Sequence, residues 1–192
     1  EAPYLSVGFF TMTRKRAICL SVLFVGELLT ATAMGYFENE MQQAIVLAMF
    51  IPLIISSGGN SGSQAASLII RSLALGEVKL HDWWRVLVRE LASGLALGCV
   101  LGGIALARIL LWPTRVKLYG EHYALVGLAV AISLIGVVLY GTFAGAMLPI
   151  LLRRLGLDPA VSSAPFVATL VDVTGIIIYF TIAALLLRGT LL

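Results

Sequence analysis

The chain has 192 residues, of which 60% are hydrophobic and only 12% are charged, and its mean hydropathy is +1.01. A soluble globular chain carries about 25% charged residues, so the polar surface here is too small for a water-soluble fold. The formal net charge of +3 comes from basic residues gathered at the ends of apolar runs, a pattern that reports membrane topology and argues against a nucleic-acid partner.

Five apolar runs are long enough to span a bilayer, which takes about 20 residues. We therefore expect an all-α membrane protein with transmembrane helices at residues 17–37, 44–75, 86–112, 123–152 and 160–187. Residues 1–16 are expected to form an interfacial lead-in segment, and residues 17–192 to form the transmembrane domain. Because the chain begins with Glu1 instead of Met, we expect it to be a fragment of a longer protein.

Basic residues predict how these spans are oriented. They cluster at residues 14–16, at residues 71–89 and at residues 153–154, and all three places fall on the same side of the predicted membrane. Arg115 and Lys117 lie on the other side and weaken the asymmetry without reversing it. Since cytoplasmic loops carry the excess of Lys and Arg, the N-terminus is expected inside and the C-terminus outside.

The second span is interrupted by a polar, glycine-rich stretch at residues 56–64. A continuous helix over residues 44–75 would rise about 48 Å, whereas the hydrocarbon core is about 30 Å thick. The element is therefore either long and tilted or broken at its glycines. In both cases polar groups lie at membrane depth, where they must face protein or a water-filled cavity.

Glycines in the third span are spaced four residues apart, at Gly94, Gly98 and Gly102. This spacing places them on one helical face and predicts close packing against another helix. Gly141 and Gly145 repeat the spacing in the fourth span.

Charged side chains inside the spans are few, and each costs about 2.5–3.5 kcal/mol at a helix centre on insertion scales. Arg89 and Glu90 follow two tryptophans, so we expect interfacial anchoring or ion pairing. Glu27 lies in the middle of the first span, where it either bonds a neighbouring helix or lines a polar path.

Asp172, in the middle of the fifth span, has the most informative surroundings. At about 100° per residue it shares a small and polar stripe with Pro165, Ala168, Thr169, Gly175 and Tyr179. The opposite face is expected to face lipid and comprises Phe166, Val167, Leu170, Val173, Ile177 and Phe180. A carboxylate with room for water suits a hard cation such as Mg²⁺, which keeps several of its waters when bound. The alternative is a buried aspartate paired with a residue such as Asn60 or Arg89.

No nucleophile–base pair, phosphate-binding loop or metalloprotease motif occurs in the chain, so we expect no enzymatic activity. Residues 58–62 resemble a glycine-rich phosphate loop but lack its lysine, and at membrane depth they favour close helix contact or a polar pore wall.

Three segments resemble the MgtE family of magnesium channels: PLIISSGGNSGSQ at residues 52–64, LGLDPA at residues 155–160 and APFVATLVDVTG at residues 164–175. The resemblance implies a multi-pass protein of the bacterial inner membrane. It implies a homodimer with a pore along the dimer axis, lined by spans two and five. Family members usually also carry a cytoplasmic N-terminal domain and CBS domains, which we expect to be absent from this chain.

The resemblance also implies residue roles. Asp172 of each subunit would hold a largely hydrated Mg²⁺, the backbone carbonyl of Ala168 would contribute to the same site, and Asp158 would mark a second ion position near the gate. The implied pore lining comprises Asn60, Gly58, Gly59, Ser61, Gln64, Pro165, Thr169 and Gly175. Mn²⁺, Co²⁺ and Ca²⁺ also bind oxygen ligands, and the sequence does not discriminate among them.

The leading hypothesis is thus a channel that conducts Mg²⁺ down its electrochemical gradient. The alternative is a secondary transporter coupled to Na⁺ or protons, with Asp172 or Glu27 exchanging the coupling ion. A third hypothesis, a membrane anchor without transport, conflicts with the density of polar groups inside the spans.

Overall fold

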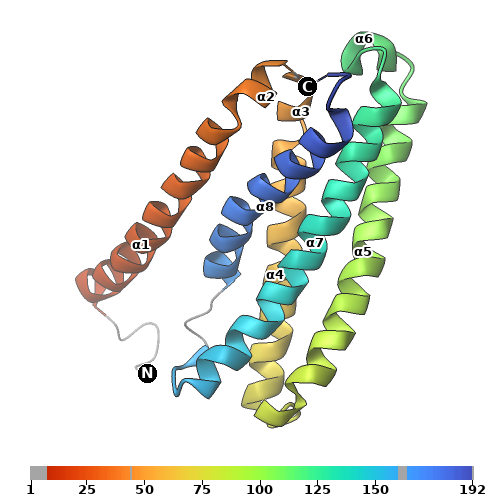
Figure 1. Ribbon diagram of the computed structural model, residues 1–192. Helices are drawn as coiled ribbons and strands as arrows, with labels where there is room; N and C mark the ends of the chain where they lie inside the picture. Colours follow the sequence, from red (N-terminus) through yellow and green to blue (C-terminus); the bar gives the residue numbers. More distant parts are fainter. Residues whose placement is uncertain (1–7, 44, 160–163, 192) are drawn as a thin grey trace.

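The computed structural model describes residues 8–43, 45–159 and 164–191, and the ordered elements within these ranges are all helical. In chain order they are α1 (Phe9–Tyr36), α2 (Glu38–Gln43), α3 (Ile45–Ala48), α4 (Ile51–Ala74), η2 (Leu80–Asp82), α5 (Trp83–Leu111), α6 (Arg115–Tyr119), α7 (Tyr123–Arg154) and α8 (Ala164–Leu187) (Figure 1). Five segments of the described chain are long and apolar enough to cross a membrane. The prediction of an all-α chain with five membrane-spanning helices is confirmed.

Helix α7 lies at the centre of the bundle, where α4, α5 and α8 pack around it, and α4 also packs on α8. Helix α1 packs mainly on α8 and leans away from it toward its own N-terminal end (Figure 1). In the most apolar window of α7, 56% of the residues are buried, against 6% in α1. The bundle is therefore built on α7, and α1 is a peripheral arm that leaves space beside α8.

The predicted glycine face of the third span is confirmed. A methyl group added to Gly98 would lie 2.8 Å from the Cα atom of Ile135, and one added to Gly102 would lie 2.8 Å from the carbonyl oxygen of Ala131. Both neighbours belong to the backbone of α7, so α5 and α7 touch along the glycine stripe with no room for a side chain.

Helix α4 continues through all of the glycines in the polar stretch, so the open alternative of a break there is wrong. Gly58 and Gly62 abut the backbone of Gly141 and Gly145 on α7, which lets the two helices meet closely while both keep their helical geometry. The interruption instead precedes Ile51, where a turn separates α3 from α4. Pro52 stands in the first turn of α4, where a missing N–H breaks no intrahelical bond.

The three basic segments lie at one end of the bundle: the start of α1, the α4–α5 connection and the end of α7 (Figure 1). Arg153 donates from Nη1 to the carbonyl oxygen of Leu73 at 2.7 Å, which joins the last turns of α7 and α4. Which side of the membrane this end faces stays a prediction.

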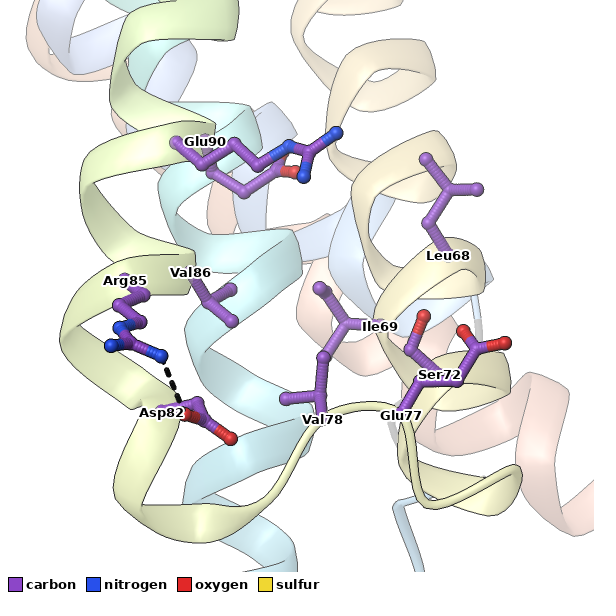
Figure 2. A pocket seen from close by; sticks show the side chains of 10 residues that line it. Leu68, Ile69, Ser72, Glu77, Val78, Asp82, Arg85, Val86 and Glu90 are labelled. Atoms are coloured by element: carbon purple, nitrogen blue, oxygen red, sulfur yellow. Dashed lines mark ion pairs between the residues drawn. The ribbon is translucent and has the colours of Figure 1, made fainter.

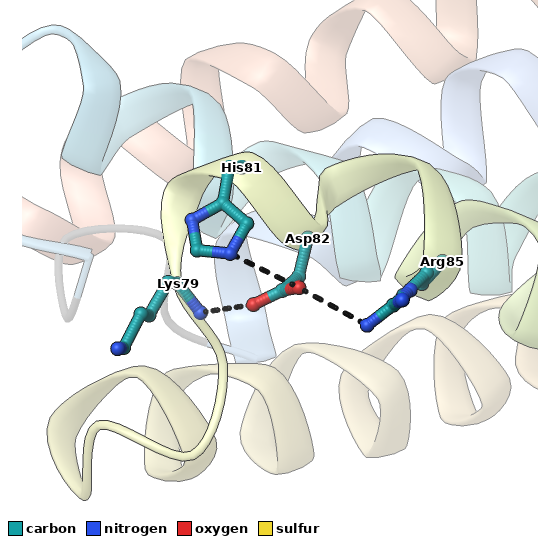
Figure 3. A network of polar contacts seen from close by, with 4 residues as sticks. All are labelled: Lys79, His81, Asp82 and Arg85. Carbon is teal, nitrogen blue, oxygen red and sulfur yellow. Dashed lines mark hydrogen bonds and ion pairs between the residues drawn. The ribbon is translucent and has the colours of Figure 1, made fainter.

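Asp82 organises the connection between α4 and α5. Its carboxylate accepts a hydrogen bond from the backbone N–H of Lys79 at 3.1 Å, and it lies 3.5 Å from Nε2 of His81 and 3.8 Å from Nη1 of Arg85 (Figure 3). These contacts hold the start of α5 against the loop, so the role of Asp82 is structural.

Of two further predictions, the structure leaves one untested and contradicts part of the other. Helix α1 starts at Phe9 and continues past residue 16, so no break marks the predicted lead-in boundary, and its interfacial position stays a prediction. The lipid-facing assignment is wrong for Val167 and Phe180, which are both fully buried. Phe180 stacks on Phe37 with ring centroids 5.2 Å apart, because neighbouring helices cover this part of α8, whereas Phe166 and Ile177 on the same predicted face are 41% and 45% exposed.

Candidate functional site: a carboxylate cavity beside the polar face of α4

Asp172 lies partly buried on α8 and opens into a cavity of about 740 Å³ between α1 and α8. The wall from α8 consists of Pro165, Ala168, Thr169 and Asp172. These are four of the six residues that sequence periodicity places on one stripe, so the stripe is confirmed for those four. Gly175 and Tyr179 do not line this cavity, and Tyr179 is instead fully buried against α3.

Helix α1 supplies the facing wall of the cavity, and Glu27 is part of it. The Glu27 carboxylate is close enough to act electrostatically on Asp172. Two acidic side chains from different helices therefore share one cavity in the middle of the spans. Among the described residues no Lys or Arg lines this cavity, so its electrostatic field favours cations.

Helix α4 approaches the same site through Gly59. A methyl group on Gly59 would lie 3.6 Å from the Cβ atom of Ala168 and 3.8 Å from Oδ1 of Asp172. The absence of a side chain at this position keeps α4 next to the carboxylate without covering it. The structure thus brings Gly59, Ala168 and Asp172 together, and their roles at an ion site stay a prediction.

The face of α4 next to this contact is polar. Asn60, Ser63, Gln64 and Ser67 line a second cavity of about 560 Å³, and three of them, Asn60, Gln64 and Ser67, are exposed. Ser63 donates to the carbonyl oxygen of Ala164 at 3.1 Å, which fastens this face to the first turn of α8. Lipid cannot satisfy exposed amides and hydroxyls at membrane depth, so this face needs water or a protein partner.

Three residues expected to line a pore lie in helix contacts within the chain. Gly58 is buried against Val137 and Val171, and Gly175 is buried against Val137. Ser61 is also buried, and its hydroxyl has no hydrogen-bond partner among the described residues. In the single chain these residues hold α4, α7 and α8 together, and their place on a pore wall stays a prediction.

Asp158 does not line the Asp172 cavity. It is exposed in the segment between α7 and α8, next to residues 160–163, which lie outside the described part of the chain. The structure therefore leaves its predicted role at a second ion position separate from the Asp172 site.

The alternative pairing of Asp172 with Asn60 or Arg89 does not occur within the described residues. Asn60 donates from Nδ2 to the hydroxyl of Ser56 at 3.3 Å, and Arg89 lines a different cavity. In the part of the chain that the structure covers, no hydrogen bond or ion pair satisfies the Asp172 carboxylate.

That different cavity, of about 680 Å³, lies between the end of α4 and the start of α5. Figure 2 shows Val86 and Glu90 on α5 facing Ile69 and Ser72 on α4 across it. Its charged groups are of both signs, because Arg85 and Arg89 stand among three carboxylates. Anchoring or ion pairing remains the expected role of Arg89 and Glu90.

The sequence interpretation missed the contribution of α1 beyond Glu27. Ala17, Ser21 and Phe24 also line the Asp172 cavity. Their spacing of four and three residues, continued by Glu27, puts them on one helical face. The sequence signal was two small residues, Ala17 and Ser21, in helical register with the intramembrane carboxylate of Glu27.

A single chain offers an incomplete metal site. Among the described residues no group of three or more His, Cys, Asp or Glu side chains is placed to hold a metal ion together. The cavity instead combines two carboxylates with open volume. This arrangement suits a cation that keeps much of its water, or one that gains ligands from a second subunit.

Comparisons with known proteins agree with this geometry. A family model described as "Divalent cation transporter", MgtE, matches residues 51–182, which run from the first residue of α4 into α8. The chain is 39% identical over 186 residues to the magnesium transporter MgtE of Thermus thermophilus, which covers 97% of this chain and 39% of that protein. It is 32% identical over 169 residues to the magnesium transporter MgtE of Enterococcus faecalis, covering 88% of this chain and 35% of that protein.

A third relative, the magnesium transporter MgtE of Bacillus subtilis, is 33% identical over 162 residues, which is 84% of this chain and 34% of the relative. The chain thus spans less than two fifths of the length of these relatives. The family match includes Gly59 on α4 and Asp172 on α8, but not α1, which supplies the other wall of the cavity. This multi-pass membrane chain belongs to the MgtE family of divalent cation transporters.

Proposed function

We propose that the chain forms the pore of a divalent cation channel that conducts Mg²⁺ down its electrochemical gradient. The observation that carries the proposal is the Asp172 carboxylate, which has no cationic partner in its cavity and lies beside the exposed polar face of α4. Membership in a family of divalent cation transporters supports it. The bacterial relatives named as magnesium transporters support Mg²⁺ as the transported ion and a bacterial inner membrane as its location.

The pore is proposed to form between two copies of the chain, with α4 and α8 of each lining the dimer axis. Exposed Asn60, Gln64 and Ser67 need a polar neighbour at membrane depth, and a water-filled path between two subunits supplies one. One Asp172 from each subunit then gives a pair of carboxylates across the axis. Two such charges form a stronger divalent site than the one Asp172 of a single chain.

The transported ion is proposed to remain largely hydrated at Asp172. Six waters occupy about 180 Å³ at about 30 Å³ each, and the cavity holds about 740 Å³, so a hydrated ion fits. Asp172 would attract the ion, and the carbonyl of Ala168 and the hydroxyl of Thr169 would contact its waters. Glu27 would extend the negative potential along α1, and Asp158 would hold an ion nearer the cytoplasmic gate.

The membrane potential supplies the driving force. One charge moving across 100 mV is worth about 2.3 kcal/mol, so a divalent cation gains about twice that amount on entry. No chemical step is needed. Mn²⁺, Co²⁺ and Ca²⁺ are proposed as competing ions at the same oxygen ligands.

The test is Mg²⁺ uptake into liposomes containing the purified chain, with Asp172→Asn and Asp172→Ala compared with wild type. Both variants should lose uptake, because each removes the charge that attracts the ion. Glu121→Gln is the control, since it removes an exposed carboxylate that lines neither cavity of the site. Normal uptake by folded Asp172→Asn protein would sink the proposal, and a wild-type chain that folds but conducts nothing would favour an anchoring role.

A secondary transporter is the competing function, and one observation favours it. Glu27 and Asp172 share a cavity, as carboxylates that exchange a coupling ion would. Uptake that stops when the Na⁺ or proton gradient is collapsed at constant membrane potential would support the transporter. Uptake that follows voltage alone supports the channel.

A further inference from the structure

A fourth cavity, of about 370 Å³, lies on the face of α7 that α4 leaves uncovered. Tyr140, Phe143, Met147 and Leu151 form its floor, and Trp83 at the start of α5 forms part of its wall. Phe143 is 40% exposed and Leu151 is 51% exposed, so the groove is open at the surface of the bundle. None of the polar residues of α4 contributes to it.

The groove has the length of one lipid leaflet. Its α7 residues recur every three or four positions from Tyr140 to Arg154, which keeps them on one helical face. This stretch of α7 rises about 21 Å. Half of a hydrocarbon core is about 15 Å, so the groove reaches from near the bilayer midplane to the headgroup region.

Arg154 stands at the headgroup end of the groove and is exposed. Its neighbour Arg153 donates a hydrogen bond to the carbonyl oxygen of Leu73, whereas Arg154 forms no hydrogen bond or ion pair within the described chain. Trp83, which is 45% exposed, lies at the same end, and tryptophan favours the membrane–water interface. A free guanidinium above an apolar groove complements an anionic head on an acyl chain.

We propose that this groove binds an anionic phospholipid, with one acyl chain along Tyr140, Phe143, Met147 and Leu151 and the phosphate on Arg154. The charge of Arg154 selects an anionic lipid, in accord with the observation that basic pockets between membrane helices bind anionic headgroups. A second copy of the chain is a poorer occupant, because a dimer built on the polar face of α4 leaves this apolar groove uncovered. The inference does not depend on the ion that the chain transports.

The experiment measures lipid binding and thermal unfolding of the purified 192-residue chain in mild detergent, with phosphatidylglycerol or phosphatidylcholine of the same acyl chains added. Phosphatidylglycerol should raise the unfolding temperature more than phosphatidylcholine. Arg154→Gln should remove this difference and weaken phosphatidylglycerol binding about fivefold, the equivalent of about 1 kcal/mol for one basic residue at an anionic surface. Glycerol phosphate without acyl chains should have no effect.

Arg16→Gln is the matched control, because Arg16 is an exposed basic residue of α1 at the same end of the bundle and does not line the groove. It should keep the full response to phosphatidylglycerol. A lipid with a photoreactive acyl chain should label the groove around Phe143 and Met147. The proposal is overturned if Arg154→Gln keeps the response, if Arg16→Gln loses it equally, or if the groove cross-links to a second copy of the chain instead of to lipid.

Discussion

Gly58 and Gly59 are adjacent in α4, and replacing each with alanine tests helix packing and ion transport separately. A methyl group on Gly58 would lie 2.5 Å from Cγ1 of Val137 and 2.7 Å from Cγ1 of Val171. Ordinary carbon contacts are about 3.5–4.0 Å, so both approaches are about 1 Å too short. The two valines cannot rotate away easily, because β-branched side chains in helices have one strongly preferred rotamer. At Gly59 the nearest atoms are at ordinary contact distance, 3.6 Å and beyond.

The expected difference in unfolding free energy between the two alanine variants follows from these distances. Replacing glycine with alanine inside a helix gains up to about 1 kcal/mol of helix propensity, and the gain is shared by Gly58→Ala and Gly59→Ala. The comparison therefore isolates the overpacking cost, which is about 1–3 kcal/mol. Gly58→Ala should unfold more easily than Gly59→Ala by that amount in a detergent-based equilibrium unfolding assay. Equal stability of the two variants would refute the close packing of α4 between α7 and α8.

Transport should show the opposite order among folded proteins. The methyl group of Gly59→Ala would stand 3.8 Å from Oδ1 of Asp172, next to the carboxylate that is proposed to hold the hydrated ion. Mg²⁺ uptake into liposomes should therefore fall while the unfolding free energy is kept or raised. Gly103→Ala is the control, since a methyl group there meets nothing within 4 Å. Unchanged uptake by Gly59→Ala would contradict the proposed path of the ion beside this contact.

Two further predictions concern the fold. Gly102→Ala should destabilise the chain by about 1–3 kcal/mol relative to Gly103→Ala, because only its methyl group would press on the Ala131 carbonyl, at 2.8 Å; equal unfolding midpoints would refute the α5–α7 contact. Tyr179→Phe should cost about 0.5–1.5 kcal/mol, because the buried hydroxyl of Tyr179 donates to the carbonyl oxygen of Leu47 at 2.8 Å. Its effect is measured by the same unfolding assay, and wild-type stability would show that this bond joining α8 to α3 contributes nothing.

Much of the fold could be predicted from local pattern. Bilayer thickness sets the length of an apolar span, so the five spans follow from the lengths of the apolar runs. The helical period places residues on faces, which is why the stripe around Asp172 and the glycine face at Gly94, Gly98 and Gly102 were both found. Resemblance of residues 52–64 and 164–175 to a known family indicated the two helices that meet at the site.

The tertiary structure decided which helix covers each face. In a soluble protein, polar residues mark the surface, but a membrane helix is apolar toward both lipid and protein, so Val167 and Phe180 looked lipid-facing although both are buried. The glycines of α4 were equally ambiguous, because glycine is compatible both with a broken helix and with a close helix crossing. Only the position of α7 shows that they form a close crossing. Glu27 is far from Asp172 in the sequence, and only the packing of α1 on α8 puts both carboxylates in one cavity. The sequence alone thus determined the spans and their faces, and helix packing decided what each face meets, because the contacts that select a neighbour are between residues distant in the chain.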